Sequence, residues 1–336
     1  CAAARQALRL HLWAPAFTGF GGGIGSFSRA VAIAMRESGH QVHLFGKHDS
    51  TGTWNAFPLS GSGESQRAQT LRFAALCVGS CVRERPANVV SAHVNFGPAA
   101  FLARKLAGTP YTVVAHGIDV HPRLPRATKL SLRRASSVLA VSDWTRQRVL
   151  ELGVAAEKIR VLPNTFDETR FDVGARSQAL IDRYRISPGE KVVLTVARLD
   201  SGERYKGYDR MIEALPAVRA ACGKVRLVLA GGGDDVARVR ALTRAVGVES
   251  AVTFAGFVPD DELPQHYRLA DAFAMPSTGE GFGIVYLEAM GCGTPVLAGN
   301  RDGSTDAVGG GTLGALVDPD DVGAIAAGVI SLLSRE

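Results

Sequence analysis

The sequence contains few cysteines, and their arrangement does not suggest a disulfide framework or a zinc site. Five cysteines occur, an odd number: Cys77 and Cys81 are four residues apart on a predicted helix, while Cys1, Cys222 and Cys292 are scattered. There is no Cys-x-x-Cys motif. These features argue against a small disulfide-stapled secreted domain and against cysteine-bound zinc, and they indicate a reducing cytoplasm.

Long hydrophobic runs are also missing. No apolar stretch reaches about 18 residues, so the sequence predicts no membrane-spanning helix. The first residues, CAAARQALRLHLWAP, have neither an initiator Met nor a long apolar core before a cleavage site. We interpret this segment as a trimmed start and not as a signal peptide.

The composition that remains is typical of a soluble enzyme with two domains. The chain has 336 residues, of which 46% are hydrophobic and 21% charged, and its 38 glycines suit many tight turns between strands and helices. Short β-branched runs alternate with longer amphipathic stretches, and this alternation starts again after LPNTFDETRF. We therefore predict two doubly wound parallel-sheet domains, residues 1–170 and 171–336, with residues 170–190 as their connection and the ligand in a cleft between them.

A glycine-rich turn near the C-terminal end predicts an anion site. Within TGEGFGIVYLEAMGCGTPV, the strand AFAMPS is followed by the turn TGEGFG and by a predicted helix. Gly281 and Gly283 allow backbone N–H groups to approach a phosphate, and the helix start adds positive partial charge. Glu280 could then accept hydrogen bonds from neighbouring hydroxyls, and Glu288 from a ribose. The alternative is a capped helix with two solvated acids.

The two glutamates and the segment around them resemble a known enzyme family. The phrase EGFGIVYLEAMGCGTPV is similar to the retaining glycosyltransferases of the GT-B fold, family 4, also called glycosyl transferases group 1. The resemblance covers nearly the whole chain. It implies two Rossmann-like domains and transfer of a hexose from a nucleotide sugar to an acceptor hydroxyl. Relatives continue beyond ISLLSRE with helices that cross back to the first domain, so we expect the chain to be clipped there.

Other segments match the same family. VARLDSGERYKGYDRMIEAL supplies Arg198 and Lys206, which the resemblance implies stabilise the leaving diphosphate without a metal. AHGID supplies His116, implied to contact the transferred sugar, and Asp119, implied to support the acceptor side. Each of these residues alone has an ordinary interpretation, a surface charge or a satisfied core histidine. The catalytic residues implied are thus His116, Arg198, Lys206 and Glu280.

The resemblance also implies a set of donor-binding positions. They are Gly22, Gly23 and Gly25 in GFGGGIGS beside the diphosphate, Gly256, Phe257 and Val258 beside the base, and Gly281, Phe282, Gly283, Ile284 and Glu288 around the turn. Two segments depart from the family pattern. Thr165 and Phe166 replace a Gly and a small aliphatic residue, and AGNRDGSTDAV replaces a Gly-Gly-x-x-Glu phrase, with Asp306 at the usual acid position.

A dinucleotide-binding fold is the competing interpretation of the first glycine-rich loop. The Gly-x-Gly-x-x-Gly fingerprint needs glycines at offsets of two and five, but the last position falls on Ser26 or Ser28. The acid expected to bind ribose would fall near Gly46 or Lys47, and Asp49 is a poor substitute. We therefore reject NAD binding.

A basic stretch and the remaining alternatives complete the sequence-based hypothesis. HPRLPRATKLSLRRASS carries Arg123, Arg126, Lys129, Arg133 and Arg134, which form either a solvated helix face or a surface for an anionic acceptor or membrane.

We expect a cytoplasmic protein, peripheral at the inner membrane face, acting on a lipid-linked acceptor. Nucleic-acid binding has no motif support. A non-catalytic sugar-nucleotide sensor, a phosphorylase and an epimerase remain alternatives.

Overall fold

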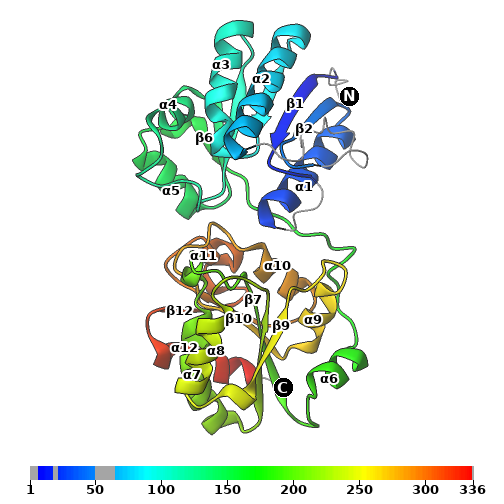
Figure 1. The fold of residues 1–336 in the computed structure, drawn as a ribbon, viewed down its shortest axis with the longest axis vertical. Coiled ribbons are helices and arrows are strands. Elements are labelled where there is room, and N and C mark those ends of the chain that lie inside the picture. The colour runs from blue at the N-terminus through cyan, green and yellow to red at the C-terminus, as the bar shows by residue number, and fades with distance from the viewer. Residues whose placement is uncertain (1–6, 18–21, 50–64, 335–336) are drawn as a thin grey trace. The chain divides into compact units, whose positions relative to one another are not determined.

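The computed structural model describes residues 7–17, 22–49 and 65–334 of the chain (Figure 1). The chain divides into two compact units, Cys1–Thr165 and Phe166–Glu336. The division lies five residues before the boundary that we expected at Arg170. The expected connection, residues 170–190, belongs to the second unit and contains a helix of its own, α6 (Gln178–Tyr184).

The first unit is built on a six-stranded parallel sheet in the order β2-β1-β3-β4-β5-β6. Its strands are β1 (Arg9–Ala14), β2 (Gln41–Gly46), β3 (Asn88–Ser91), β4 (Tyr111–Ala115), β5 (Ser137–Ala140) and β6 (Ile159–Val161). Its helices are α1 (Gly23–Glu37), α2 (Gln66–Glu84), α3 (Gly97–Ala107), α4 (Arg126–Arg134) and α5 (Asp143–Glu151), with short 3₁₀ turns η1 (Val94–Phe96) and η2 (Ala156–Lys158).

The second unit has the same kind of sheet, in the order β12-β11-β10-β7-β8-β9. Its strands are β7 (Lys191–Val196), β8 (Val225–Ala230), β9 (Val252–Gly256), β10 (Ala272–Met275), β11 (Val296–Gly299) and β12 (Ala315–Val317). Besides α6, its helices are α7 (Tyr208–Cys222), α8 (Val236–Ala245), α9 (Leu263–Leu269), α10 (Ile284–Gly291), α11 (Ser304–Ala307) and α12 (Val322–Leu333), with 3₁₀ turns η3 (Arg204–Lys206), η4 (Glu249–Ala251) and η5 (Gly309–Gly311).

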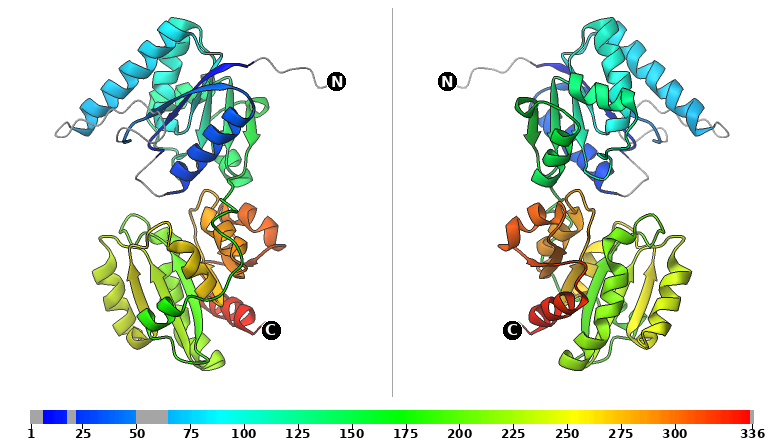
Figure 2. Two further views of the ribbon diagram at one scale, coloured as in Figure 1. Left: turned by 90° about the vertical axis from the view of Figure 1, so that its right-hand side faces the viewer. Right: turned by 90° about the vertical axis from the view of Figure 1, so that its left-hand side faces the viewer.

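The strands are apolar because helices cover their sheets. Every residue of β4 and β10 is buried, as expected for parallel strands that lie inside a layered fold. In the first unit α2 and α3 pack side by side, and in the second α7 packs against α12 (Figure 2). The core of the first unit contains Trp13, Phe45 and Tyr111, all almost completely buried. The predicted doubly wound architecture is confirmed.

One helix begins earlier than the sequence pattern predicts. We expected Gly22, Gly23 and Gly25 to lie in a loop, with the helix starting at Phe27. Instead α1 starts at Gly23, so Gly23 and Gly25 form its first turn and Gly22 caps it. Glycine disfavours helix interiors, but the first turn tolerates it because its N–H groups have no intrahelical partner in any case.

Each sheet has one switch point, where the order of successive strands changes direction across the sheet. In the first sheet β1 lies between β2 and β3, and in the second β7 lies between β8 and β10. Ligands of doubly wound sheets bind beyond the carboxyl ends of the strands at such a position. No helix among the described residues is both long and apolar enough to cross a bilayer.

Candidate active site

The loops that follow β7 and β10 contact each other at the switch point of the second unit. Lys206 is the last residue of η3, in the loop 197–207, and Glu280 lies in the loop 276–283. Lys206 Nζ is 2.8 Å from Glu280 Oε2. The Thr278 N–H donates to the Tyr205 carbonyl at 2.8 Å, which fastens the two loops together. The structure thus brings together two residues that the sequence placed 74 positions apart.

Lys206 is charged in this surrounding. Its side chain is only 16% exposed. Burial by itself lowers the pKa of the amine, but Glu280, Tyr205 and Glu203 outweigh burial, and the pKa of Lys206 is raised. The cation is therefore held ionised in a partly dehydrated position, where its field on a bound anion is stronger than in open water.

Glu203 links Lys206 to the second cation of the site. Arg198 forms an ion pair with Glu203 Oε1, and Glu203 Oε2 lies 4.0 Å from Lys206 Nζ. The Arg198 side chain is 71% exposed, so it can move toward a ligand. Sequence reasoning selected both cations but missed Glu203, whose only signal is its place between them in the loop 197–207.

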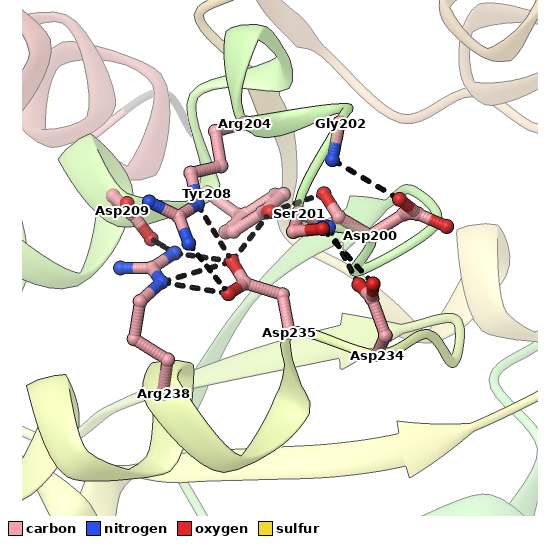
Figure 3. A network of polar contacts seen from close by, with 9 residues as sticks. All are labelled: Asp200, Ser201, Gly202, Arg204, Tyr208, Asp209, Asp234, Asp235 and Arg238. Carbon is pink, nitrogen blue, oxygen red and sulfur yellow. Dashed lines mark hydrogen bonds and ion pairs between the residues drawn. The ribbon is translucent and has the colours of Figure 1, made fainter.

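A network of acids holds the loop 197–207 in its conformation (Figure 3). Asp235 accepts hydrogen bonds from Arg204, Arg238 and the Tyr208 hydroxyl, at 3.0 Å from Arg204 Nη2 and 3.1 Å from the hydroxyl. Hydrogen bonds from Arg238 and Arg204 keep the pKa of Asp235 well below its usual range, although burial opposes them. Asp234 accepts from Ser201 at 2.7 Å. Both flanks of Lys206 are thereby anchored.

Gly207 fixes the contact between this loop and the end of β10. Its φ is +79°, a conformation that favours glycine, and a Cβ there would lie 2.2 Å from the Pro276 carbonyl oxygen. Any larger residue would push Lys206 away from Glu280. This explains physically why Gly follows Lys in the sequence.

Asp302 anchors the loop that carries Glu280. This acid follows β11 and is 1% exposed. Its Oδ2 accepts from the Glu280 N–H and the Ser277 hydroxyl, each at 2.7 Å, and Oδ1 accepts from the Ser304 N–H at 2.9 Å. Burial raises the pKa of Asp302, and these hydrogen bonds oppose that rise. Sequence reasoning missed Asp302, since it chose Asp306 in the same segment.

The start of α10 provides backbone donors next to Glu280. Gly283 caps the helix with a φ of +88°, and a Cβ there would lie 2.5 Å from the Tyr286 ring. Gly281, Phe282 and Ile284 are buried around it. The first N–H groups of a helix lack intrahelical acceptors, so this end can bind an anion.

Glu288 lies within α10, and its carboxylate already accepts a hydrogen bond from another residue. Its Oε2 accepts a hydrogen bond from the Tyr267 hydroxyl at 2.8 Å. Burial raises its pKa to about 7, although Tyr267 and Arg170 act in the opposite direction. Glu288 is therefore partly protonated near neutral pH, a property that the sequence pattern did not predict.

In the first unit His116 follows β4 and is held in one tautomer. Its ring Nε2 is 2.9 Å from the Ala92 carbonyl, which can only accept, so Nε2 carries the proton and Nδ1 is left as an acceptor. Burial lowers the pKa of His116, and Asp119 opposes this effect. Asp119 Oδ1 accepts from the His116 N–H at 2.8 Å, which shapes the turn after the strand.

The remaining predicted positions lie at loop ends. Gly22 and Gly23 are exposed at the start of α1, and Gly25 is half-buried. Gly256 ends β9 with a φ of +71°, and Phe257 after it is 80% exposed. Phe257 and the half-buried Val258 are thus accessible beyond the carboxyl end of their strand.

The expectation of a metal-free site assumed that the chain lacks an Asp-x-Asp motif, and this assumption was wrong, because the sequence contains the triplet Asp318-Pro319-Asp320. Both carboxylates pair with Arg301, Asp318 at 2.6 Å from Arg301 Nη2. The triplet lies after β12, at the edge strand of the sheet. Pro319 and Asp320 nevertheless line a pocket together with Tyr205 and Gly207, the neighbours of Lys206 in the chain, and with Thr278 of the loop that carries Glu280.

Two family models match the chain in succession. Residues 22–165 match the glycosyl transferase 4-like domain, and residues 177–336 match glycosyl transferases group 1. The chain belongs to glycosyltransferase family 4. It is a glycosyltransferase of the hexosyltransferase type with the GT-B fold, as its sequence motifs predicted.

Named relatives of this glycosyltransferase act on glycolipids and other acceptors. A GDP-mannose-dependent alpha-(1-6)-phosphatidylinositol monomannoside mannosyltransferase of Mycobacterium tuberculosis is 36% identical over 76% of this chain and 71% of the relative. A 2-deoxystreptamine glucosyltransferase of Streptomyces kanamyceticus is 29% identical over 75% of this chain and 70% of the relative. Anabaena HepE, solved with UDP and glucose, shares the fold with a TM-score of 0.78 at 23% identity, covering 98% of this chain and 90% of HepE.

Proposed function

We propose that this glycosyltransferase transfers a hexose from a nucleoside diphosphate sugar to an acceptor hydroxyl, and that the second unit holds the diphosphate. The observation that carries this proposal is the partly buried pair of Lys206 and Glu280 beside the start of α10. A bound diphosphate would receive charge from Lys206, Arg198 and the helix start. Glu280 would then be free to accept from a sugar hydroxyl.

The leaving group is stabilised most where its charge develops. The diphosphate oxygen gains negative charge as the glycosidic bond breaks, and Lys206 is positioned by hydrogen bonds before that step. A cation that is already held in place, as Lys206 is by Glu280, needs no reorganisation during the reaction. On this basis the transfer needs no divalent metal in the active site. Addition of Mg²⁺ or Mn²⁺ to EDTA-treated enzyme should leave kcat unchanged, and a large activation by either ion would contradict this assignment.

We further propose that the anomeric configuration is retained. No carboxylate among our candidates is a clear nucleophile, so attack by the acceptor on the face that the leaving group vacates is favoured, with the departing phosphate oxygen taking the acceptor proton. His116 would contact the transferred sugar through Nδ1, the acceptor nitrogen that its bond to Ala92 leaves available. NMR analysis of the product anomer tests this step, and an inverted product would disprove it.

The donor and acceptor of the mycobacterial relative are the first candidates to test. Its name specifies GDP-mannose and a phosphatidylinositol monomannoside. We propose a lipid-linked acceptor of this class in cell-envelope glycolipid synthesis. The basic residues of the first unit support contact with an anionic membrane surface, because four of them are exposed: Arg123, Arg126, Arg133 and Arg134. Each such cation near an anionic bilayer adds ~1 kcal/mol of attraction.

A thermal-shift panel tests the proposed function. GDP, UDP, ADP and their sugars are each added to the enzyme, and the true donor should raise the Tm by mass action, with about 2.7 kcal/mol of stabilisation at a hundredfold excess over Kd. Transfer is then measured as release of the nucleoside diphosphate in the presence of acceptor. Binding without any release would favour a sugar-nucleotide sensor, and dependence on inorganic phosphate would favour a phosphorylase.

Vesicle binding tests the membrane contact separately. The enzyme should cosediment with vesicles that contain anionic lipid and not with neutral vesicles, and added salt should release it. Equal binding to both kinds of vesicle would reject an electrostatic contact. This result would not affect the donor assignment.

A further inference from the structure

Two histidines and a glutamate converge on one face of the first sheet. His11 on β1 and His43 on β2 are direct partners in the parallel register, so both side chains point to the same face. Their rings stack with centroids 5.5 Å apart and planes within 12°. Glu84, the last residue of α2, reaches the two rings from above the sheet. None of these residues has a role in the proposed transfer reaction.

The three potential ligand atoms have the spacing of a metal site. Glu84 Oε2 is 3.2 Å from His11 Nε2 and 2.7 Å from His43 Nδ1, and all three atoms lie within 4.8 Å of one another. Around a tetrahedral Zn²⁺, with bonds of about 2.0–2.2 Å, neighbouring ligand atoms are about 3.4 Å apart. Small side-chain rotations would therefore place all three atoms on one ion.

The hydrogen bonds within this group do not include the ring Nδ1 of His43. Its Nδ1 is a buried atom at ion-pair distance from Glu84 Oε2, 2.7 Å, but among the described residues it makes no hydrogen bond of regular geometry. A buried nitrogen without a well-aligned hydrogen bond costs free energy, even when a carboxylate lies beside it. A metal ion bound by both atoms, once side-chain rotation has moved them to about 3.4 Å apart, would satisfy the nitrogen and the carboxylate.

The surrounding residues already provide the outer contacts that metal ligands need. If His11 binds an ion through Nε2, its Nδ1–H faces Cys81 Sγ, 3.6 Å away. Glu84 Oε1, the other carboxylate oxygen, accepts from the Ser80 hydroxyl at 2.8 Å. Such contacts fix the tautomer of a ligating histidine and the orientation of a ligating carboxylate.

We propose that His11, His43 and Glu84 bind one divalent transition-metal ion, with Zn²⁺ as the preferred ion and water at the fourth position. Two imidazoles and a carboxylate suit zinc in ligand type and number. The His43 side chain is 38% exposed, so water can reach the open position, whereas His11 is fully buried.

The role of this ion is structural. His11 is the third residue of β1, and His43 the third of β2, so the ion lies toward the amino ends of the strands. Residues assigned to sugar transfer, such as His116, follow the carboxyl ends. The ion would clamp the end of α2 to the two strands β1 and β2.

Metal content and thermal stability of the full chain test this proposal. The protein is treated with EDTA, transferred to metal-free buffer and titrated with ZnCl₂. We expect about one zinc per chain by mass spectrometry after removal of free metal, and a Tm increase of roughly 5 °C that EDTA reverses. Co²⁺ in place of zinc should give the intense visible absorption of a tetrahedral site.

Single substitutions identify the ligands. His43→Ala should abolish retained zinc, the Tm increase and the Co²⁺ absorption, and because its side chain is partly exposed the variant should still fold. His40→Ala, one residue before β2 and outside the group, is the matched control and should bind zinc like the unaltered protein. Glu84→Gln provides a second ligand variant. Zinc binding below about 0.2 per chain, zinc retained by His43→Ala, or zinc lost equally in His40→Ala would overturn the proposal.

Discussion

Lys206 Nζ and Glu280 Oε2 lie 2.8 Å apart and join the loops that follow the neighbouring strands β7 and β10. Each side chain is less than one-fifth exposed, so the pair is shielded from screening by salt. The lysine charge is thus already oriented at the switch point of the second sheet. An arriving diphosphate would find a cation in place and would not need to order a flexible side chain.

The first prediction concerns Lys206 alone. Lys206→Ala should lower kcat by about 10²–10³ while changing the donor KM far less, because the charge that lysine stabilises is larger in the transition state. Steady-state kinetics measure this, with circular dichroism as the check on folding. Lys224→Ala, which removes an exposed lysine of the same unit, is the control and should retain activity. An unchanged kcat in Lys206→Ala would exclude it from the leaving-group site.

The second prediction is that Arg198 and Lys206 act together. Glu203 contacts both, so removal of one cation changes the surroundings of the other. The Arg198→Ala and Lys206→Ala double variant should therefore lose less activity than the product of the two single losses. A double-mutant cycle on kcat/KM measures the coupling. Losses that multiply without any coupling would show that the two cations act on separate charges.

The third prediction concerns donor binding by Glu288. If its carboxylate accepts from the ribose, Glu288→Gln should weaken donor affinity roughly ten- to a hundredfold at about pH 8. The pKa of Glu288 is about 7, so its carboxylate becomes protonated in the unaltered enzyme as the pH falls below that value. The difference in donor affinity between the unaltered enzyme and Glu288→Gln should therefore be smaller at about pH 6. Calorimetric titration of both proteins with the donor at both pH values measures these affinities. Equal affinities at the higher pH would remove Glu288 from the ribose site.

The fourth prediction concerns the effect of the same group on stability. The folded protein raises the pKa of Glu288 from 4.5 to about 7, so between these values the folded state binds more protons than the unfolded state. The free energy of unfolding therefore falls as the pH rises toward 7. Relative to Glu288→Gln, the unaltered protein should lose roughly 2 kcal/mol between about pH 5 and about pH 8. Urea unfolding of both proteins measures this, and a constant difference would refute the raised pKa.

The fifth prediction concerns Asp302 as a positioning residue. Asp302→Ala leaves three donors of the buried network without their acceptor, including the Glu280 N–H, and should destabilise the protein by roughly 3 kcal/mol. It should also lower kcat, because Glu280 is no longer held beside Lys206. Asp302→Asn keeps the size and some of the acceptors, so it should recover part of the activity. The control is Asp261→Asn, which changes an exposed aspartate of the same unit. An equal loss of activity in this control would contradict a specific positioning role for Asp302.

The sequence by itself determined the architecture and the central motif of this protein. Strand runs such as KVVLTV and the turn from Thr278 to Ile284 depend on residues that are neighbours in the chain. Apolar periodicity and turn glycines act over a few residues, and so they can be read without the fold. The start of α1 was the exception, since glycines are as typical of a loop as of a first helical turn.

Only the tertiary structure decided which side chains meet. The contact of Lys206 with Glu280, the anchoring of that loop by Asp302 and the hydrogen bond from Tyr267 to Glu288 all depend on strand order. The same holds for His11, His43 and Glu84, whose spacing in the sequence indicates no metal motif. Strands that are neighbours in a sheet are distant in the chain, so their loop contacts and the dehydration that shifts pKa values arise only when the sheet closes.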